Sequence, residues 1–167
     1  YHIPMVIEIQ GHLNVDALQR SVNAVIHRHE ALRTVFPCID GQPVQEIAES
    51  RNCPLEIIDC RGLPVSEQDE IVRIRALDEQ DRSFDLESGP LLRTCLFQMH
   101  DRFVLIMTIH HIISDGWSIG ILRRELAEFY EAFRQNTLPL LPPLSLQYAD
   151  FSEWQRTSID GDRLRSQ

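Results

Sequence analysis

The chain has 167 residues, of which 43% are hydrophobic and 25% are charged, and its formal net charge at pH 7 is −9. This length is sufficient for one domain with its own core, and the composition is ordinary for a soluble globular protein. The acidic balance and the lack of a basic patch argue against nucleic acid or an anionic membrane surface as a partner. No apolar run reaches the ~18 residues of a membrane-spanning helix, and no signal peptide is visible.

Four cysteines are present, and no two of them have CxxC spacing: Cys38, Cys53, Cys60 and Cys95. We therefore expect no zinc site and interpret the cysteines as free thiols of a protein in the reducing cytoplasm. The sequence begins at Tyr1, without an initiator Met and almost inside a strand-like stretch, and it stops at "DGDRLRSQ" without a clear structural end. Both ends lead us to expect a fragment of a longer protein.

Hydrophobic periodicity divides the chain into strands and helices. In chain order, the predicted elements are strand 3–9, helix 14–32, a hairpin within 33–48, strand 54–59, helix 66–80, a hairpin of 91–98 and 103–110, helix 118–134, an extended connector 138–145 and a short helix 146–156. Asn14 can cap the first helix, and Asp40-Gly41 marks the first hairpin turn. Residues 103–110 are apolar on both parities, which predicts a central strand covered on both faces.

Two of the predicted helices carry specific signals at their starts. We expect Ser66 to begin one helix, with Asp69 as a loose capping box. The inward-facing residues of that helix are expected to be Ile71, Ile74 and Leu77. We expect Ser118 to cap the long helix, with Trp117 and Leu122 forming a hydrophobic staple. The mixture of hairpins and helices predicts an α+β or mixed α/β fold.

The segment "TIHHIISDGWSIG" (108–120) holds the leading candidate site. Adjacent residues on a strand point to opposite faces, so His110 and His111 are expected to face different layers, one structural and one chemical. Gly116 allows a backbone conformation that other residues resist and lets another molecule approach closely. Its N–H lies near a predicted helix N-terminus, where negative charge is favoured. A general base at a strand end beside such a donor is the layout that acyl transfer needs.

Other interpretations of this segment stay open at this level. The histidine pair can be purely structural, and Asp115 can be a turn or capping residue. A metal site would need a further cluster of ligands at suitable spacing, which the sequence lacks. Ser114 as a nucleophile would need a GxSxG context, which is also missing.

Four segments, in order, carry a family pattern: "RHEALRTVF" (28–36), "FDLESGPLLR" (84–93), "HHIISDG" (110–116) and "YADFSEWQR" (148–156). They resemble the RHExLRTxF, FDLxxGPLLR, HHxxxDG and YxDFxxWQ motifs of condensation domains of nonribosomal peptide synthetases. The resemblance covers essentially the whole chain. It implies that residues 1–167 are the N-terminal lobe of a chloramphenicol-acetyltransferase-like pair, with the C-terminal lobe and the opening motif absent. The implied fold class is α/β, an α+β two-layer sandwich with a mixed, mostly antiparallel sheet and packed helices.

The resemblance also implies a reaction and its partners, in peptide antibiotic biosynthesis. An upstream carrier protein brings an acyl or peptidyl thioester on a phosphopantetheine arm, and a downstream carrier protein brings an aminoacyl thioester whose amine attacks it. No cofactor is expected to bind the chain directly, and an adjacent adenylation domain is implied. Because one wall of the tunnel is missing, we expect the fragment itself to be inactive.

Family roles carry over to individual residues of this sequence. His111 is implied to be the general base or the group that positions the amine, and Gly116 is implied to donate its backbone N–H at the reaction centre. Residues implied to support the site structurally are His110, Asp115, Arg33 and Arg28. In particular, Asp115 is implied to pair with Arg33, with Arg28 as the alternative partner.

The subtype and two rival functions complete the expectations. "SDGWS" followed by "RREL" resembles domains that join two L-configured residues. One rival is a stand-alone acyltransferase that takes acyl-CoA, because such proteins share the fold and HHxxxDG. The other is a non-catalytic module that recruits a carrier protein, against which the intact HHxxxDG argues.

Overall fold

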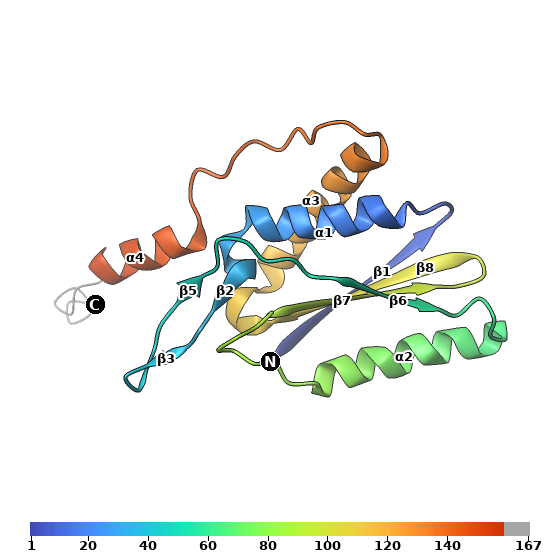
Figure 1. Cartoon of the computed structure of the whole chain (residues 1–167), viewed down its shortest axis with the longest axis horizontal. Helices are drawn as coiled ribbons and strands as arrows, with labels where there is room; N and C mark the ends of the chain where they lie inside the picture. The colour runs from blue at the N-terminus through green and yellow to red at the C-terminus, as the bar shows by residue number, and fades with distance from the viewer. Residues whose placement is uncertain (159–167) are drawn as a thin grey trace.

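A four-stranded sheet lies at the centre of the computed structural model, which describes residues 1–158 (Figure 1). In spatial order, its strands are β1 (His2–Gln10), β8 (Arg102–His110), β7 (Leu92–Gln98) and β6 (Leu55–Asp59). β1, β8 and β7 pair antiparallel, whereas β6 joins β7 in parallel. The expected mixed, mostly antiparallel sheet is confirmed.

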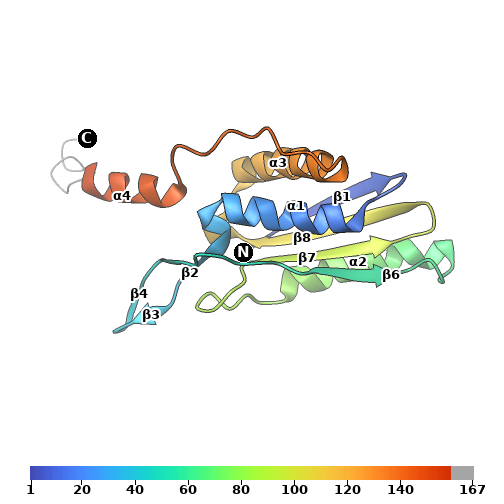
Figure 2. The same cartoon turned by 45° about the horizontal axis from the view of Figure 1, so that its top comes forward.

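Helices cover both faces of this sheet. The helices are α1 (Val15–Arg28), α2 (Val65–Asp81), α3 (Gly116–Arg134) and α4 (Tyr148–Ser158), with short 3-10 turns η1 (Glu30–Arg33) and η2 (His111–Ile113). α1 and α3 pack on one face and α2 lies on the other, so the sheet is covered on both of its faces (Figures 1 and 2). The reason lies in β8, where Leu105 and Met107 face α1 and α3 while Val104 and Ile106 face α2. A strand that is apolar on both parities has to be covered twice.

Two short ladders extend the lobe beyond the sheet. They pair β2 (Thr34–Val35) with β5 (Glu46–Ile47), and β3 (Cys38–Ile39) with β4 (Gln42–Pro43). The turn of the outer ladder has positive φ at both Asp40 (51°) and Gly41 (76°). Two consecutive left-handed residues match the twist of a two-residue hairpin, which confirms the turn predicted there.

The core holds the end of β8 in a fixed position. Fully buried side chains from α1 and the sheet pack together, including Val22, Ile26, Leu96, Leu105 and Ile109. Full burial of a side chain of this size stabilises the fold by roughly 1.5–3 kcal/mol. Since Ile109 is the residue before the histidine pair, packing defines the backbone up to the candidate site.

α2 departs from its predicted pattern. It begins at Val65 and its N-cap Pro64 makes no side-chain hydrogen bond, so the capping box expected from Ser66 is wrong. Ile74 and Leu77, expected inside, are each 46% exposed. Two hydrogen-bonded polar residues take buried positions instead, Gln68 and Glu79. Polar side chains are buried when they have partners, and a hydrophobic pattern does not detect those partners.

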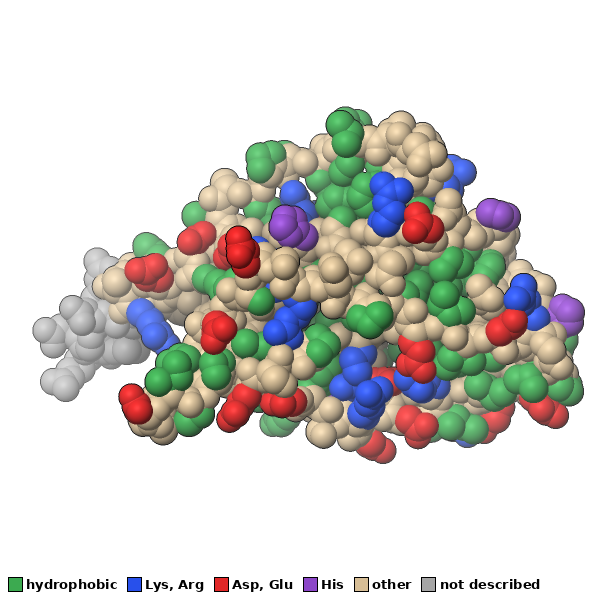
Figure 3. Space-filling view, viewed as in Figure 1, with side chains coloured by type: hydrophobic (Ala, Val, Ile, Leu, Met, Phe, Trp, Pro, Cys, Tyr) green, Lys and Arg blue, Asp and Glu red, His purple; other side chains and the backbone are tan. Residues whose placement is uncertain are grey.

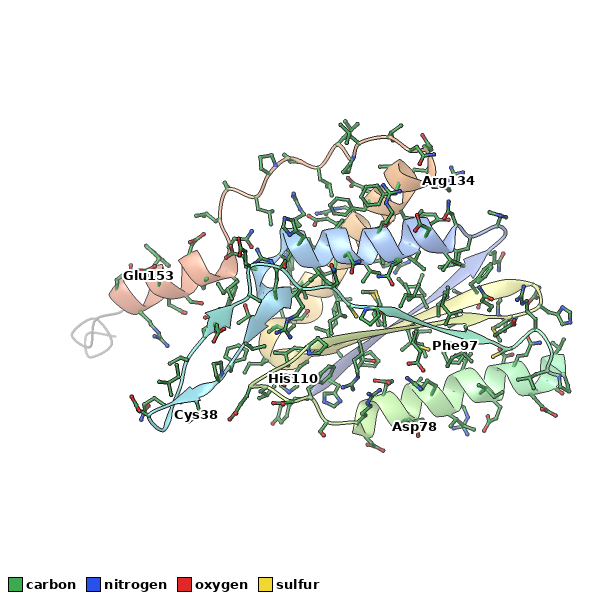
Figure 4. The ribbon with its side chains drawn as sticks, viewed as in Figure 1. Cys38, Asp78, Phe97, His110, Arg134 and Glu153 are labelled. Atoms are coloured by element: carbon green, nitrogen blue, oxygen red, sulfur yellow. The ribbon has the colours of Figure 1, made fainter. Side chains whose placement is uncertain are left out.

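The surface is charged and interrupted by apolar side chains. Figure 3 shows arginine and carboxylate side chains interspersed with hydrophobic ones on the face viewed. Within residues 1–158, no helix has the length and apolar character needed to cross a membrane. The cysteines are free thiols, of which Cys38 is exposed on the outer ladder and the others are buried (Figure 4).

Candidate active site

β8 ends beside a cavity of about 390 Å³. η1, η2, the first turns of α3 and the segment before α4 contribute its walls, and the residues that matter below are His111, Ser114, Asp115, Leu144, Gln147 and Tyr148. The side chain of His111, the first residue of η2, is exposed and lines this cavity. Its backbone N–H donates to the carbonyl oxygen of Tyr1 at 2.9 Å, which ties the turn to the neighbouring strand.

His110 lies on the other side of the strand end. Its ring contacts the rings of His2 and Phe84 at centroid distances of 5.8 Å each, and Figure 4 labels it at the end of β8. Its Nδ1 accepts a hydrogen bond from the backbone N–H of Ile112 at 3.1 Å and so caps η2. Burial, followed by the charge of His2, lowers the pKa of His110. The structure thus places the two histidines in different surroundings, as their parity predicted.

Asp115 is the N-cap of α3. Its Oδ1 accepts hydrogen bonds from the backbone N–H of Ser118 at 2.8 Å and from the Ser118 hydroxyl at 2.6 Å. These bonds are the main reason why the pKa of Asp115 lies below its ordinary value. The cap of α3 is therefore Asp115 and not the predicted Ser118. The helix begins at Gly116, three residues earlier than a cap at Ser118 would give. Trp117 is 82% exposed, so the expected staple with Leu122 does not form.

The expected ion pair between Asp115 and Arg33 is wrong in this structure. The guanidinium of Arg33 donates to the carbonyl oxygens of Ala48 and Glu49 and lies 3.8 Å from a carboxylate oxygen of Glu30. Arg33 therefore fastens η1 to the end of β5. The carboxylate of Asp115 is instead occupied by the first turn of its own helix, which a short capping side chain reaches without any tertiary contact.

Arg28, the alternative partner of Asp115, also forms its ion pair with another residue. Its Nε donates to Oε2 of Glu125 at 3.0 Å, and Nε2 of His29 lies 2.6 Å from the same oxygen. Glu125, on α3, is only 3% exposed. The RHE segment at the end of α1 is therefore bound to the middle of α3 through one buried carboxylate.

Gly116 is the first residue of α3 and is exposed. Positive φ is found at Gly11, Gly41 and Gly89, and Gly116 is not among them. The special backbone conformation expected of Gly116 is therefore wrong. A Cβ placed there would meet nothing within 4 Å, so the space beside its Cα is open. As the first helical residue it has no partner for its N–H within α3.

Gln147 is a structural residue that sequence reasoning missed. Its amide donates to the carbonyl oxygen of Arg28 at 3.0 Å and accepts from the backbone N–H of Glu30 at 3.2 Å. It thereby joins the segment before α4 to the end of α1 and places Leu144 and Tyr148 on the cavity wall. Glu125 was missed as well, although it is a polar residue on the apolar face that Leu122 and Leu126 define, which is a signal the sequence contains.

Together these contacts define what the site can do chemically. An exposed imidazole stands on a cavity wall beside the N-terminus of a 19-residue helix. That arrangement can accept a proton from a nucleophile and stabilise negative charge nearby. Among residues 1–158, no group of three His, Cys, Asp or Glu side chains is placed to hold a metal ion.

The chain belongs to the condensation domain family. The model of that family, described as Condensation domain, matches residues 1–167. Malpinin synthetase of Mortierella alpina is 42% identical over 168 residues, which are 100% of this chain and 2% of that protein. Phosphinothricin tripeptide synthetase PhsC of Streptomyces viridochromogenes is 42% identical over 165 residues, which are 98% of this chain and 15% of that protein. The chain thus spans a small part of these peptide synthetases.

Solved structures agree with this assignment. The X-domain from teicoplanin biosynthesis superimposes with a TM-score of 0.86 at 31% identity, over 97% of this chain and 34% of that chain. The starter condensation domain of rhizomide synthetase has a TM-score of 0.86 at 18% identity, over 99% of this chain and 40% of that chain, and supports the fold alone. The resemblance to condensation domains and the chloramphenicol-acetyltransferase-like fold are confirmed. The roles of the individual site residues stay predictions.

Proposed function

We propose that this chain forms part of a condensation domain that joins two carrier-bound thioesters into an amide. The donor is an acyl or peptidyl thioester and the acceptor is an aminoacyl thioester, each delivered on the phosphopantetheine arm of a carrier protein. The acceptor amine attacks the donor carbonyl carbon, the carbon–sulfur bond breaks, and the donor arm leaves as its thiol. The peptide then stays on the acceptor arm.

In this proposal, His111 handles the amine and α3 handles the carbonyl. His111 accepts the proton of the attacking amine or fixes the direction in which the amine approaches. The N–H of Gly116, at the positive end of α3, donates to the oxygen on which negative charge develops. Asp115 and His110 contribute indirectly, because they define where α3 and η2 begin.

The observation that carries the proposal is the exposed ring of His111 on the cavity wall, beside the first turn of α3. Membership in a family of peptide synthetase domains adds the reaction class. The end of the motif with the two residues after it, "SDGWS", and the following "RREL" favour two L-configured substrates. The curated relatives are much longer proteins, which makes carrier and adenylation domains plausible neighbours in the complete protein.

The test compares two histidine variants of the complete protein that carries this sequence. With loaded donor and acceptor carrier proteins, His111→Ala is expected to lower amide formation by about 10²-fold or more, the usual contribution of a positioned base. His12→Ala is the matched control, because His12 is an exposed histidine of the loop before α1. Wild-type turnover in a folded His111→Ala protein would leave the base role without support.

A non-catalytic recruiting module is the second candidate. The X-domain from teicoplanin biosynthesis has also been solved in a complex with OxyB. Under this alternative, the complete protein would bind a carrier-bound peptide and make no amide. The same assay therefore separates the two functions, since only the condensation reaction yields a product that depends on His111.

A further inference from the structure

Buried hydroxyl groups without partners mark two places in the lobe. Among the described residues, four buried side-chain polar atoms have no hydrogen-bond partner: Nε of Arg75, Nε of Arg102, Oγ1 of Thr108 and Oγ of Ser114. The two arginines make ion pairs through other nitrogen atoms. The two hydroxyls have no second polar group, and a buried hydroxyl without a partner carries a free-energy penalty that needs an explanation.

The two hydroxyls lie in different cavities. Thr108 is 1% exposed and lines a cavity of about 360 Å³ between α2 and the sheet, together with Arg93 and Cys95. Ser114 is 7% exposed, has an extended backbone between η2 and α3, and lines the cavity that contains His111. Ser114 is therefore a residue of the candidate active-site wall whose hydroxyl is buried and without a partner among the described residues.

We propose that Ser114 positions the acceptor aminoacyl thioester through a hydrogen bond with its hydroxyl, an inference that rests on the proposed function. Ser114 follows His111 by three positions, and both line the same cavity, so a group held by Ser114 is presented close to the imidazole. The acceptor is the substrate whose amine has to reach His111. A serine hydroxyl both donates and accepts, and rotation about its single χ1 bond turns Oγ from the cavity wall toward a bound molecule.

If the hydroxyl of Ser114 had a purely structural role, its removal would have a different effect. Such a group would have a partner within the fold, and its removal would destabilise the protein. The hydroxyl of Ser114 has no partner among the described residues, so its removal relieves a penalty in the unliganded protein. Ser114→Ala is therefore expected to preserve stability while weakening substrate binding, which is the combination that separates a ligand contact from a structural contact.

The experiment uses the complete protein and two matched variants, Ser114→Ala and Thr108→Val. Each variant removes one unpartnered hydroxyl, but only Ser114 lines the cavity of His111. The probe is an aminoacyl-pantetheine in which an amide replaces the thioester, and its Kd is measured by calorimetry. We expect both variants to melt at or above the wild-type temperature, Ser114→Ala to bind the probe about tenfold more weakly, and Thr108→Val to bind it as the wild type does.

Two results would overturn the inference. One is unchanged binding in Ser114→Ala, and the other is an equal loss of binding in Thr108→Val. A parallel condensation assay on the wild-type protein keeps the proposed function separate. Binding that depends on Ser114 without any amide product would reject the condensation function and leave the Ser114 contact standing, whereas amide formation with unchanged Ser114→Ala binding would reject the contact alone.

Discussion

At the scale of single residues, His110 makes the stability of the lobe depend on pH. Burial, followed by the charge of His2, holds its pKa below the ordinary value of 6.5. The unfolded chain therefore takes up this proton at a higher pH than the folded chain does. The stabilisation of the folded state by neutral His110 is therefore complete above pH 6.5. It is lost as the pH falls toward the lowered folded-state pKa, because protonation favours the unfolded state in that pH range.

This linkage predicts the behaviour of a neutral variant. Between about pH 7.5 and about pH 5.5, the melting temperature of His110→Gln should fall less than that of the wild type, because glutamine does not titrate there. His12→Gln, which replaces an exposed histidine, should follow the wild type. Parallel melting curves for the wild type and His110→Gln across this range would contradict the assignment.

Asp115 and Arg33 have separate partners, which changes what a double-mutant cycle should give. The family pattern predicted an ion pair and hence a strong coupling between the two side chains. In the structure, Asp115 binds Ser118 while Arg33 binds the carbonyl oxygens that end β5. We expect the unfolding free-energy changes of Asp115→Asn and Arg33→Ala to add within about 0.5 kcal/mol. A coupling well above that value, measured by denaturant unfolding, would restore the ion pair.

At the scale of elements, patterns of neighbouring residues predicted turns and strands correctly. Contacts between residues far apart in the sequence were not predicted. Asp40-Gly41 predicted its hairpin because the turn depends on two consecutive residues. β8 was predicted as a central strand because both of its faces are apolar. The prediction for the buried face of α2 was right for Ile71, which packs against buried residues of β7 and β8, and wrong for Ile74 and Leu77. It missed the buried Glu79, which meets Arg93 on β7. Glu79 and Arg93 are 14 residues apart and belong to different elements, so the hydrophobic periodicity of α2 does not reveal their pairing.

The same limit applies to the contact that holds the segment before α4. Gln147 bonds to one backbone group at the end of α1 and one at the start of η1, 119 and 117 residues earlier in the chain. Gln147→Ala removes both bonds, so we expect faster amide hydrogen exchange in α4 and in the segment before it, with α1 and α3 little changed. Gln155→Ala, an exposed glutamine on α4 itself, serves as the control. Unchanged exchange in Gln147→Ala would show that apolar contacts alone hold this segment.

At the scale of the whole molecule, the sequence identified the motif that contains the candidate site. It did not show which elements assemble around that motif. The sequence led to His111 and Gly116, since both belong to the HHIISDG segment, one of the four that carry the family pattern. It did not reveal the cavity, because its walls come from η1, η2, α3 and the segment before α4. The buried carboxylate that joins α1 to α3 was also missed, because Glu125 and its partners lie 96 and 97 residues apart.

Residues 1–158 expose large apolar side chains in the first turn of α3 and in and before α4, and these side chains predict how the chain behaves alone. Among the most exposed are Trp117, Leu146, Tyr148 and Trp154. We expect the 167-residue chain to fold, to self-associate and to yield no amide from loaded carriers, because catalysis depends on holding both reactants in register. Sedimentation velocity of the wild type against a Tyr148→Glu, Trp154→Glu variant measures the association. A monomeric wild-type chain, or one that makes product at the rate of the complete protein, would contradict this expectation.

The contacts of α3 at Glu125 also bear on how far the N-terminus of this helix moves when the helix tilts. α3 is a rigid rod whose anchor lies nine residues from Gly116, a distance of about 14 Å at 1.5 Å per residue. A tilt of about 5° around that anchor would move the N-terminus by roughly 1.2 Å, and a displacement near 1 Å at a reacting group can lower a rate by about 10²-fold. The contacts of Glu125 with Arg28 and His29 therefore fix the point about which α3 can tilt, and the buried side chains of Leu122 and Leu126 beside that point limit the angle.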